Sequence, residues 1–429
     1  MLPTFAWVSS HFRTLLIAGF AALVLVKIPG VLQGRLWAED GFFLIDAVRL
    51  PWWQALITPH TGYIDVVASG AMLVAVNLVK LEYVARISVL MALAIQLCPA
   101  LLLVTSRCSW LQSRWALVTA LLLVAVPPVA DEIWLSPVTS QYHLMVCVGL
   151  ILAFEAQGGL VGAFQLGLLI LAGLSGPGPA LGAPLFIVRA IIDRSWPRVI
   201  HAVALSAGAL IEIAFFWSHP VGGRHLGISV PLLLGVICVK HLLVPFFGDH
   251  IAASLARRLS EAFQARQWPV LPGAASVIAV GSLATAAIRT RARDVRWLCA
   301  GALTMMVLSY FGALGGQTNL LSIYFGARYY YAPQVLVGLT LLGVARAGPA
   351  MMRIPAAAFV GWLVFVGIHD YRHVRSEMAA GPSWRDQIAH WRTDPDAAIV
   401  LWPPSFQIHL GHIPNPLSVS FRLGPPWCT

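Results

Sequence analysis

An apolar stretch covers residues 15–32 and reads LLIAGFAALVLVKIPGVL. A helix needs about 20 mostly apolar residues to cross the hydrocarbon core of a bilayer. This stretch lacks a small-residue cleavage site and is followed by many more apolar runs, so it predicts a retained membrane helix and not a removed signal peptide. The 429-residue chain is 59% hydrophobic and only 11% charged, whereas soluble domains are about a quarter charged. The composition therefore excludes a soluble protein.

The basic residues indicate how the helices are oriented. The net charge is +10, from 28 Lys and Arg against 18 Asp and Glu. The positive residues fall mostly in short clusters between apolar runs, which is typical of cytoplasmic loops. They form no basic stripe with interleaved aromatic residues, so the sequence predicts no nucleic-acid partner. His11 and Arg13 precede the first helix, which places the N-terminus in the cytoplasm and residues 34–62 outside.

The run at residues 64–79 decides the rest of the topology. If it crosses the membrane together with 84–104, every later basic cluster faces outward. If it lies along the outer interface, all of these clusters become cytoplasmic, so we predict the interfacial arrangement. We treat 228–247 as re-entrant or interfacial for a parallel reason, because the amphipathic stretch 248–268 follows it. The basic clusters concerned are residues 107–114, 189–198, 289–296 and 346–353.

The predicted fold class is an all-α polytopic transmembrane bundle of about 11 spans. Juxtamembrane helices lie in the first outer loop, and a small extramembrane tail ends the chain. We place the transmembrane domain at residues 1–370 and the extracytoplasmic tail at 371–429, which is too short for an independent enzyme domain. The predicted spans are roughly residues 14–33, 84–105, 115–130, 142–157, 160–175, 180–192, 199–217, 270–288, 297–314, 330–346 and 354–370.

Two adjacent acids, Glu39 and Asp40, follow the first helix within the segment WAEDG at residues 37–41. Adjacent carboxylates repel each other and are costly to desolvate near a bilayer, so their placement suggests a cation, a proton or a substrate hydroxyl that meets them. A carboxylate here could act as a general base or bind a divalent metal. Alternatively, the acids begin an outer amphipathic helix and complement its dipole.

Further polar residues in the outer loops are candidates for substrate binding. His60 and Tyr63 could contact a sugar or a phosphate, although a structural hydrogen bond also explains each of them. A second acidic pair, Asp131 and Glu132, falls in the next outer loop. Two acid-bearing loops on one face predict a carboxylate-lined cavity, with a solvated turn as the alternative.

Cationic residues on the same face would complement these acids. Arg328 lies at the mouth of an apolar run, and its outer position breaks the positive-inside bias, so phosphate pairing is the natural role. The segment with Arg224 and His225 could close over an anionic group, or it could be a loop without a role. The outer cationic candidates are Lys80, Arg86, Arg224, His225 and Arg328.

The chain resembles bacterial GT-C-type integral membrane glycosyltransferases. The segment WAEDG, then Gly62 and Tyr63, then Glu132, and then Arg328 with Tyr329 carry this resemblance. It covers most of the chain by layout, but its specific motifs lie in the first ~140 residues and near 328. Where the family would have a polar stretch with Asn and Trp after the second acidic loop, this chain has SQYH at residues 140–143.

The resemblance implies a GT-C-like catalytic domain and a function. Asp40, with Glu39 second, would be the catalytic base, and Arg328 with other outer cations would hold the donor phosphate. The donor would be a polyprenyl-phosphate-linked sugar that enters from the bilayer, and the acceptor a glycan or a lipid-linked hydroxyl. The expected location is the bacterial inner membrane, with the site facing the periplasm or exterior, in cell-envelope polysaccharide synthesis. No cofactor is certain, and Mg²⁺ or Mn²⁺ could take part because one acidic pair leaves the metal open.

Two rival functions remain open at this point. A transporter or lipid-linked glycan flippase would carry polar residues at the midplane of broken helices, often in repeated halves. The segment SGPGP at residues 175–179 could be such a break, but no matching segment occurs elsewhere. An O-antigen polymerase or ligase would depend on outer arginines more than on an acid in the first loop.

Overall fold

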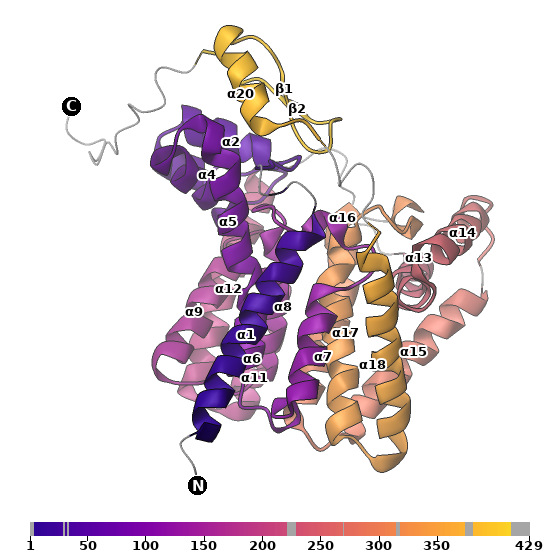
Figure 1. The fold of residues 1–429 in the computed structure, drawn as a ribbon. Coiled ribbons are helices and arrows are strands. Elements are labelled where there is room, and N and C mark those ends of the chain that lie inside the picture. The colour runs from indigo at the N-terminus through magenta and orange to yellow at the C-terminus, as the bar shows by residue number, and fades with distance from the viewer. Residues whose placement is uncertain are drawn as a thin grey trace.

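The computed structural model describes residues 4–28, 31, 34–220, 229–268, 270–314, 318–373 and 381–412, without the side chains of residues 4–10 and 311–314. Over these residues the fold is all-α apart from one short antiparallel ladder. Figure 1 shows long helices side by side, capped at one end by shorter helices and the ladder. We call this the cap end, and we call the opposite end, where the N-terminus lies, the base end.

The helices of the bundle differ widely in length. They are α1 (Thr4–Lys27), α5 (Val84–Gln96), α6 (Cys98–Thr105), α7 (Arg114–Ala125), α8 (Ser140–Ala153), α9 (Gly159–Gly173), α11 (Ala183–Asp193), α12 (Trp196–Ser218), α15 (Val270–Arg289), α16 (Arg293–Leu314), α17 (Ala327–Ala347) and α18 (Ala350–Tyr371).

The cap end contains the remaining elements, most of them short. They are α2 (Asp40–Arg49), α3 (Trp52–Ile57), α4 (Val66–Leu78), η2 (Leu81–Tyr83), η4 (Asp131–Ile133), α10 (Pro177–Ala180), α13 (Val230–Ile237), the π-helical η5 (Cys238–Leu243), α14 (Val244–Gln264), η6 (Thr318–Leu321), α20 (Trp384–Thr393), β1 (Ile399–Val400) and β2 (Gln407–Ile408). One further turn, η3 (Ser109–Leu111), lies between α6 and α7.

Helix α8 is the centre of the main core. All of its residues are buried, and it packs against α6, α9, α16 and α17. Gly149 allows α17 to come close, because a Cβ added there would lie 2.5 Å from Leu336 Cδ1. Its central place explains why α8, beyond its polar first turn at residues 140–143, is apolar on every side, as expected of a helix surrounded by others.

Several long apolar helices indicate a multi-pass membrane protein. Five helical segments of the described chain are long and apolar enough to cross a membrane: Leu81–Thr105, Trp196–Ser218, Val230–Gln264, Val270–Arg289 and Ala350–Tyr371. In α12, α15 and α18 only 17–28% of the most apolar window is buried inside the protein. Such exposed apolar faces need a nonpolar surrounding to be stable.

The structure does not support the predicted count of about eleven spans. Four shorter apolar helices, α4, α7, α8 and α9, accompany the five long segments. The predicted runs 115–130 and 142–157 fold into helices of 12 and 14 residues, which extend about 20 Å at 1.5 Å per residue. The first run continues into a loop in which Pro127 and Pro128 prevent a longer α7, and in the second run α8 ends at Ala153, just before the exposed Glu155.

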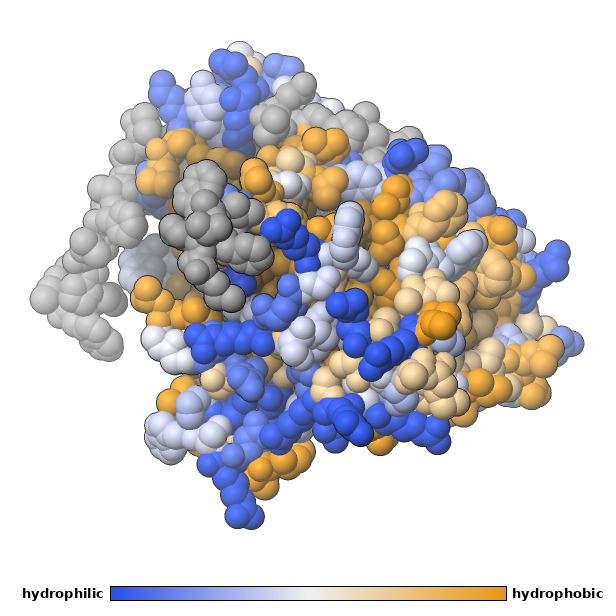
Figure 2. Space-filling view, turned by 60° about the horizontal axis from the view of Figure 1, so that its bottom comes forward, coloured by the Kyte–Doolittle hydropathy of each residue, from blue (hydrophilic) through white to orange (hydrophobic). Residues whose placement is uncertain are grey.

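The basic segments meet at the base end. The Arg114 guanidinium lies 5.3 Å from the ring centre of Phe12, near the start of α1. Trp110 donates to Asp294 at 2.6 Å, and Arg293 forms an ion pair with Asp193. Figure 2 brings the base end forward and shows hydrophilic side chains gathered there beside hydrophobic surface. The positive-inside interpretation of the sequence requires that these basic segments lie at the same end of the bundle, as they do here.

The segment at residues 64–79 does not cross the bundle. It forms α4, whose first amide donates to Leu174 O at 3.0 Å, while the following Leu81 O accepts from the Trp384 ring at 2.8 Å. Figure 1 places α4 at the cap end beside α2. Both ends of α4 therefore lie at the same end of the molecule.

The segment Val230–Gln264 is bent and does not run as one straight helix. Gly248 has φ 70° and ψ −172°, a conformation that breaks the helix and that favours glycine. A Cβ at Gly235 would lie 3.1 Å from the Phe263 ring, so the two ends return to each other as a hairpin. Length and composition alone would count this segment as a span, whereas its geometry fits the predicted re-entrant or interfacial segment.

The C-terminal tail packs into a second core with the first loop. Trp384, Trp391 and Trp402 are buried there together with residues of α2 and α4. Arg392 also forms an ion pair with Glu82 at 2.8 Å. The predicted tail at 371–429 is thus, in its described part, joined to the cap and does not stand apart from the domain at 1–370.

A contact between two glycines lets α9 and α12 pack closely, and it predicts a stability effect. A Cβ at Gly208 would lie 2.5 Å from Gly173 Cα, a backbone atom that cannot move aside. Gly208→Ala should therefore lower the melting temperature of the detergent-purified protein, with an overpacking cost of about 1–3 kcal/mol.

Gly167→Ala is the matched control on α9, because a Cβ there meets nothing within 4 Å. It should leave the melting temperature nearly unchanged. An equal melting temperature for Gly208→Ala and the unmodified chain would contradict the close contact.

Candidate functional site

The acidic segment is held in place by the C-terminal tail. Ala38 N–H donates to Trp402 O at 2.6 Å, and Trp402 N–H donates to Leu36 O at 3.1 Å, so residues 36–38 pair with the tail as a short strand would. Ala38 adopts a positive φ of 30° immediately before the acids. This turn starts α2, with Glu39 in the N-cap position and Asp40 in the first turn.

Asp40 is fully buried, and both of its carboxylate oxygens accept hydrogen bonds. Its carboxylate accepts hydrogen bonds from the Trp37 amide at 3.1 Å, the Ser136 hydroxyl at 3.1 Å and the Val138 amide at 3.2 Å. Burial raises the pKa of Asp40 to about 7, while these donors oppose the rise. Asp40 therefore joins the first loop to the loop before α8.

Glu39, unlike Asp40, is partly exposed and has only one of its two carboxylate oxygens paired. Its Oε1 pairs with Arg328 Nη1 at 3.1 Å, and both side chains remain about a quarter exposed. Its second oxygen, Oε2, is buried and has no hydrogen-bond partner among the described residues. A carboxylate oxygen without a donor is available to accept a proton.

Arg328 is the centre of a cluster that the sequence predicted only as separate residues. The Arg328 amide donates to Glu132 Oε1 at 2.7 Å, so Glu132 lies at the N-terminus of α17, where a negative charge is favoured. The guanidinium lies 5.6 Å from the Tyr329 ring centre. We call Glu39, Glu132, Arg328 and Tyr329 the carboxylate–arginine cluster.

Tyr63 and Tyr142 border this cluster. Burial raises the pKa of the Tyr63 hydroxyl, and the nearby Arg328 guanidinium opposes that rise. The ring of Tyr142 packs edge-on against Tyr329 with centres 5.9 Å apart. Tyr63, which the sequence singled out, thus lies close to Arg328, whereas Tyr142 was not singled out.

The other predicted substrate-binding residues lie elsewhere or outside the described residues. His60 pairs with Asp46 at 2.7 Å and packs on the Phe43 ring, which is the structural role that the sequence left open. Lys80 and Arg86 are exposed, and Arg86 lies over the Tyr83 ring. Neither has a contact with the cluster. Arg224 and His225 lie outside the described residues.

Buried cations under the acidic loop escaped the sequence analysis. Arg35 is 1% exposed, donates to Trp134 O at 2.6 Å and stacks near the rings of Trp37 and Trp402. Burial lowers the pKa of Arg35 to about 10, opposed by Asp40 and Asp131. Its place two residues before WAEDG is a signal that could have identified it.

Two lysines also have structural partners that the sequence did not reveal. Lys27, at the end of α1, pairs with the buried Asp131 at 2.9 Å. Lys240 in η5 donates to the carbonyl oxygens of Ile323 and Phe325, both at 3.0 Å, and to that of Ser322. Lys240 thereby fixes the loop that leads into Arg328. An ionisable residue inside an apolar run is the signal that could have pointed to it.

Within the described part of the chain, no three His, Cys, Asp or Glu side chains gather as a metal site would require. The cluster can instead accept a proton at Glu39 and pair an anion at Arg328. Comparison with known proteins adds no identification, since no family model, curated protein or solved structure matches this chain.

The raised pKa of Asp40 predicts a pH dependence of stability. The folded carboxyl, with a pKa of about 7, keeps a proton that the unfolded chain releases near its ordinary pKa of about 4. The free energy of unfolding should therefore fall as the pH rises from about 4 to about 7, by at most roughly 4 kcal/mol, and level off above that.

Asp40→Asn should make this slope shallower in melting curves recorded over that pH range, and part of the slope should remain because burial also raises the pKa of Asp65. Asp386→Asn, at an exposed position on α20, should keep it. Identical slopes for the unmodified chain and Asp40→Asn would show that Asp40 does not titrate in this way.

Proposed function

We propose that the protein is an integral membrane glycosyltransferase that moves a sugar from a polyprenyl-phosphate donor to an acceptor hydroxyl. The observation that carries the proposal is the Glu39–Arg328 pair, in which one carboxylate oxygen meets the guanidinium and the other has no partner in the described structure. The GT-C-like sequence pattern supports it independently, because its separate motifs include Glu39, Glu132, Arg328 and Tyr329.

Glu39 has the role of proton acceptor in this proposal. The acceptor oxygen attacks the anomeric carbon as Glu39 Oε2 takes its proton, and the bond from that carbon to the lipid phosphate breaks with both electrons on the phosphate. A single displacement of this kind inverts the anomeric centre. General-base assistance contributes about 10²–10⁴-fold to such a rate.

Arg328 meets the negative charge that develops on the departing phosphate. A guanidinium offers paired donors that match phosphate oxygens, and its value rises where water is partly excluded. Glu132 and Tyr329 hold the start of α17, and so keep Arg328 directed at Glu39.

The order within the acidic pair changes in this proposal. The sequence favoured Asp40 as the base, but Asp40 is 0% exposed and accepts three hydrogen bonds. We assign Asp40 to positioning, because it ties α2 to residues 136–138 and so sets where Glu39 lies.

The proposal also implies an orientation of the protein in the membrane. We place the cap end outside the inner membrane and the base end in the cytoplasm, with the shorter apolar helices crossing as part of a GT-C-like bundle. The basic segments at the base end support this orientation, and α2 to α4 would then be juxtamembrane helices.

The test is a transfer assay with a panel of polyprenyl-phosphate sugars, with and without a chelator. Glu39→Gln should lower kcat by about 10²-fold or more, since the amide cannot take the proton. Glu39→Asp should restore part of the rate. Arg328→Gln should lower it strongly, and Arg328→Lys less so, because the charge is kept without the paired donors.

Glu155→Gln is the control, at an exposed acid that follows α8 at the base end. It should transfer sugar at the unmodified rate. Full activity of a correctly folded Glu39→Gln protein would remove Glu39 from the reaction, and absence of transfer from every donor tested would reject the proposed activity.

A carrier is the second candidate, and one observation favours it. Glu212 is 3% exposed inside the apolar helix α12, and its Oε1 accepts from the Gly176 amide at 3.2 Å, at the break before α10. Buried acids beside broken helices are typical of transport sites. If the protein is a carrier, Glu212→Gln should abolish uptake into proteoliposomes while Glu39→Gln does not. Loss of sugar transfer in Glu39→Gln but not in Glu212→Gln supports the transferase.

A further inference from the structure

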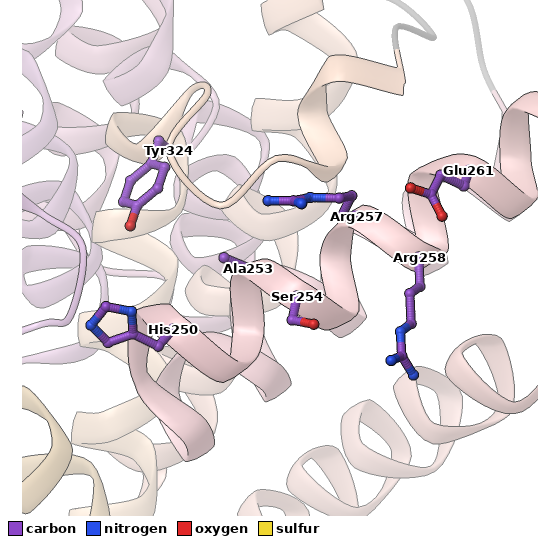
Figure 3. Close-up of a pocket in the computed structure, with 7 residues that line it drawn as sticks. All are labelled: His250, Ala253, Ser254, Arg257, Arg258, Glu261 and Tyr324. Atoms are coloured by element: carbon purple, nitrogen blue, oxygen red, sulfur yellow. The ribbon is translucent and has the colours of Figure 1, made fainter.

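A cleft of about 430 Å³ runs along one side of α14. Figure 3 shows His250 and Arg257 on the side of the helix that faces Tyr324, with Arg258 projecting on the other side. His250, Arg257 and Arg258 line the cleft against a single acid, Glu261. The cleft is therefore predominantly basic.

The two arginines of the cleft make no polar side-chain contact that stabilises the described fold. Neither Arg257 nor Arg258 forms a side-chain hydrogen bond or an ion pair with another described residue, although Glu261 lies within one helical turn of both. Surface arginines that no carboxylate neutralises attract anions, and phosphate is the anion that a guanidinium matches best. The cleft thus has the charge of an anion site.

An apolar stripe follows the cleft along the same helix. Ile251 and Leu255 are 53% and 37% exposed and stand one residue beyond His250 and Ser254, which belong to the cleft lining. Phe247, just before the break at Gly248, is also exposed. Basic and apolar stripes side by side are typical of a helix that lies at the surface of a membrane.

The position of the cleft connects it to the carboxylate–arginine cluster. Tyr324 closes the cleft and belongs to the loop that Lys240 fixes. Its carbonyl oxygen accepts from the Ala327 amide at 3.3 Å, one residue before Arg328. Only three residues, 325–327, separate Tyr324 of the cleft from Arg328.

We propose that this cleft binds the phosphate head group of a membrane lipid. Arg257 holds the phosphate on the side of α14 that faces Tyr324, Arg258 adds positive charge from the other side of the helix, and the hydrocarbon chain lies along Ile251 and Leu255. The apolar stripe favours a lipid over a soluble anion, because a free phosphate would gain nothing from it. The inference concerns binding alone and does not depend on the transfer reaction.

The test is a titration of the purified, detergent-solubilised chain with farnesyl phosphate, followed by tryptophan fluorescence. Arg257→Gln with Arg258→Gln should weaken binding by about tenfold or more, as expected when charge-assisted contacts to phosphate are lost. Arg257→Lys with Arg258→Lys should lose less. Arg266→Gln, an exposed site on the same stretch but outside the cleft, should bind within about twofold of the unmodified chain.

Two ligand controls distinguish the sources of the affinity. Farnesol, which lacks the phosphate, and inorganic phosphate, which lacks the chain, should both bind at least about tenfold more weakly. Equal binding of inorganic phosphate would assign the cleft to a soluble anion, and equal binding of farnesol would deny the arginines a role. Unchanged affinity in the folded double Gln variant, as judged by its melting temperature, would also overturn the proposal.

Discussion

Three distant parts of the chain meet at the buried carboxyl of Asp40. It receives hydrogen bonds from its own loop and from residues 136 and 138, while the tail pairs with residues 36 and 38 just before it. A buried carboxyl left without these donors would cost several kcal/mol. The position of Glu39 depends on this junction, because Glu39 lies between Ala38, which pairs with the tail, and Asp40, which is bonded to the loop before α8. Arg328 then pairs with Glu39, the acid of this pair that remains partly exposed.

Much of the architecture could be predicted from the sequence because it follows from polarity. The all-α class followed from apolar runs, and the clustering of basic segments at one end followed from their spacing. The position of 64–79 could be inferred because only one choice made all four basic segments cytoplasmic, and that of 228–247 because an amphipathic stretch follows it. Span lengths could not be inferred, since hydropathy marks where a run is apolar but not where prolines such as Pro127 and Pro128 end the helix.

Only part of the predicted site comes together in the structure, and its geometry was not predicted. Glu39, Glu132, Arg328, Tyr329 and Tyr63 do come together, although 289 residues separate Glu39 from Arg328. Nothing in a dipeptide of two acids tells which one turns inward, because that depends on donors from Ser136 and Val138 in another loop. Lys240 was equally hidden, since its partners are backbone carbonyl groups, which every sequence contains. His60, in contrast, was predicted as a possible substrate contact, but in the structure it pairs with the nearby Asp46.

The pairing between residues 36–38 and Trp402 has a consequence for biosynthesis. The acidic segment emerges from the ribosome early, yet the strand that completes it is made more than 360 residues later. Until then, Trp37 and Ala38 lack Trp402 and the other tail residues that bury them. The first loop therefore stays incomplete until this later part of the chain has been made. Assembly of the cap is thus a late event, and an insertion machinery that retained the nascent chain would protect it during that interval.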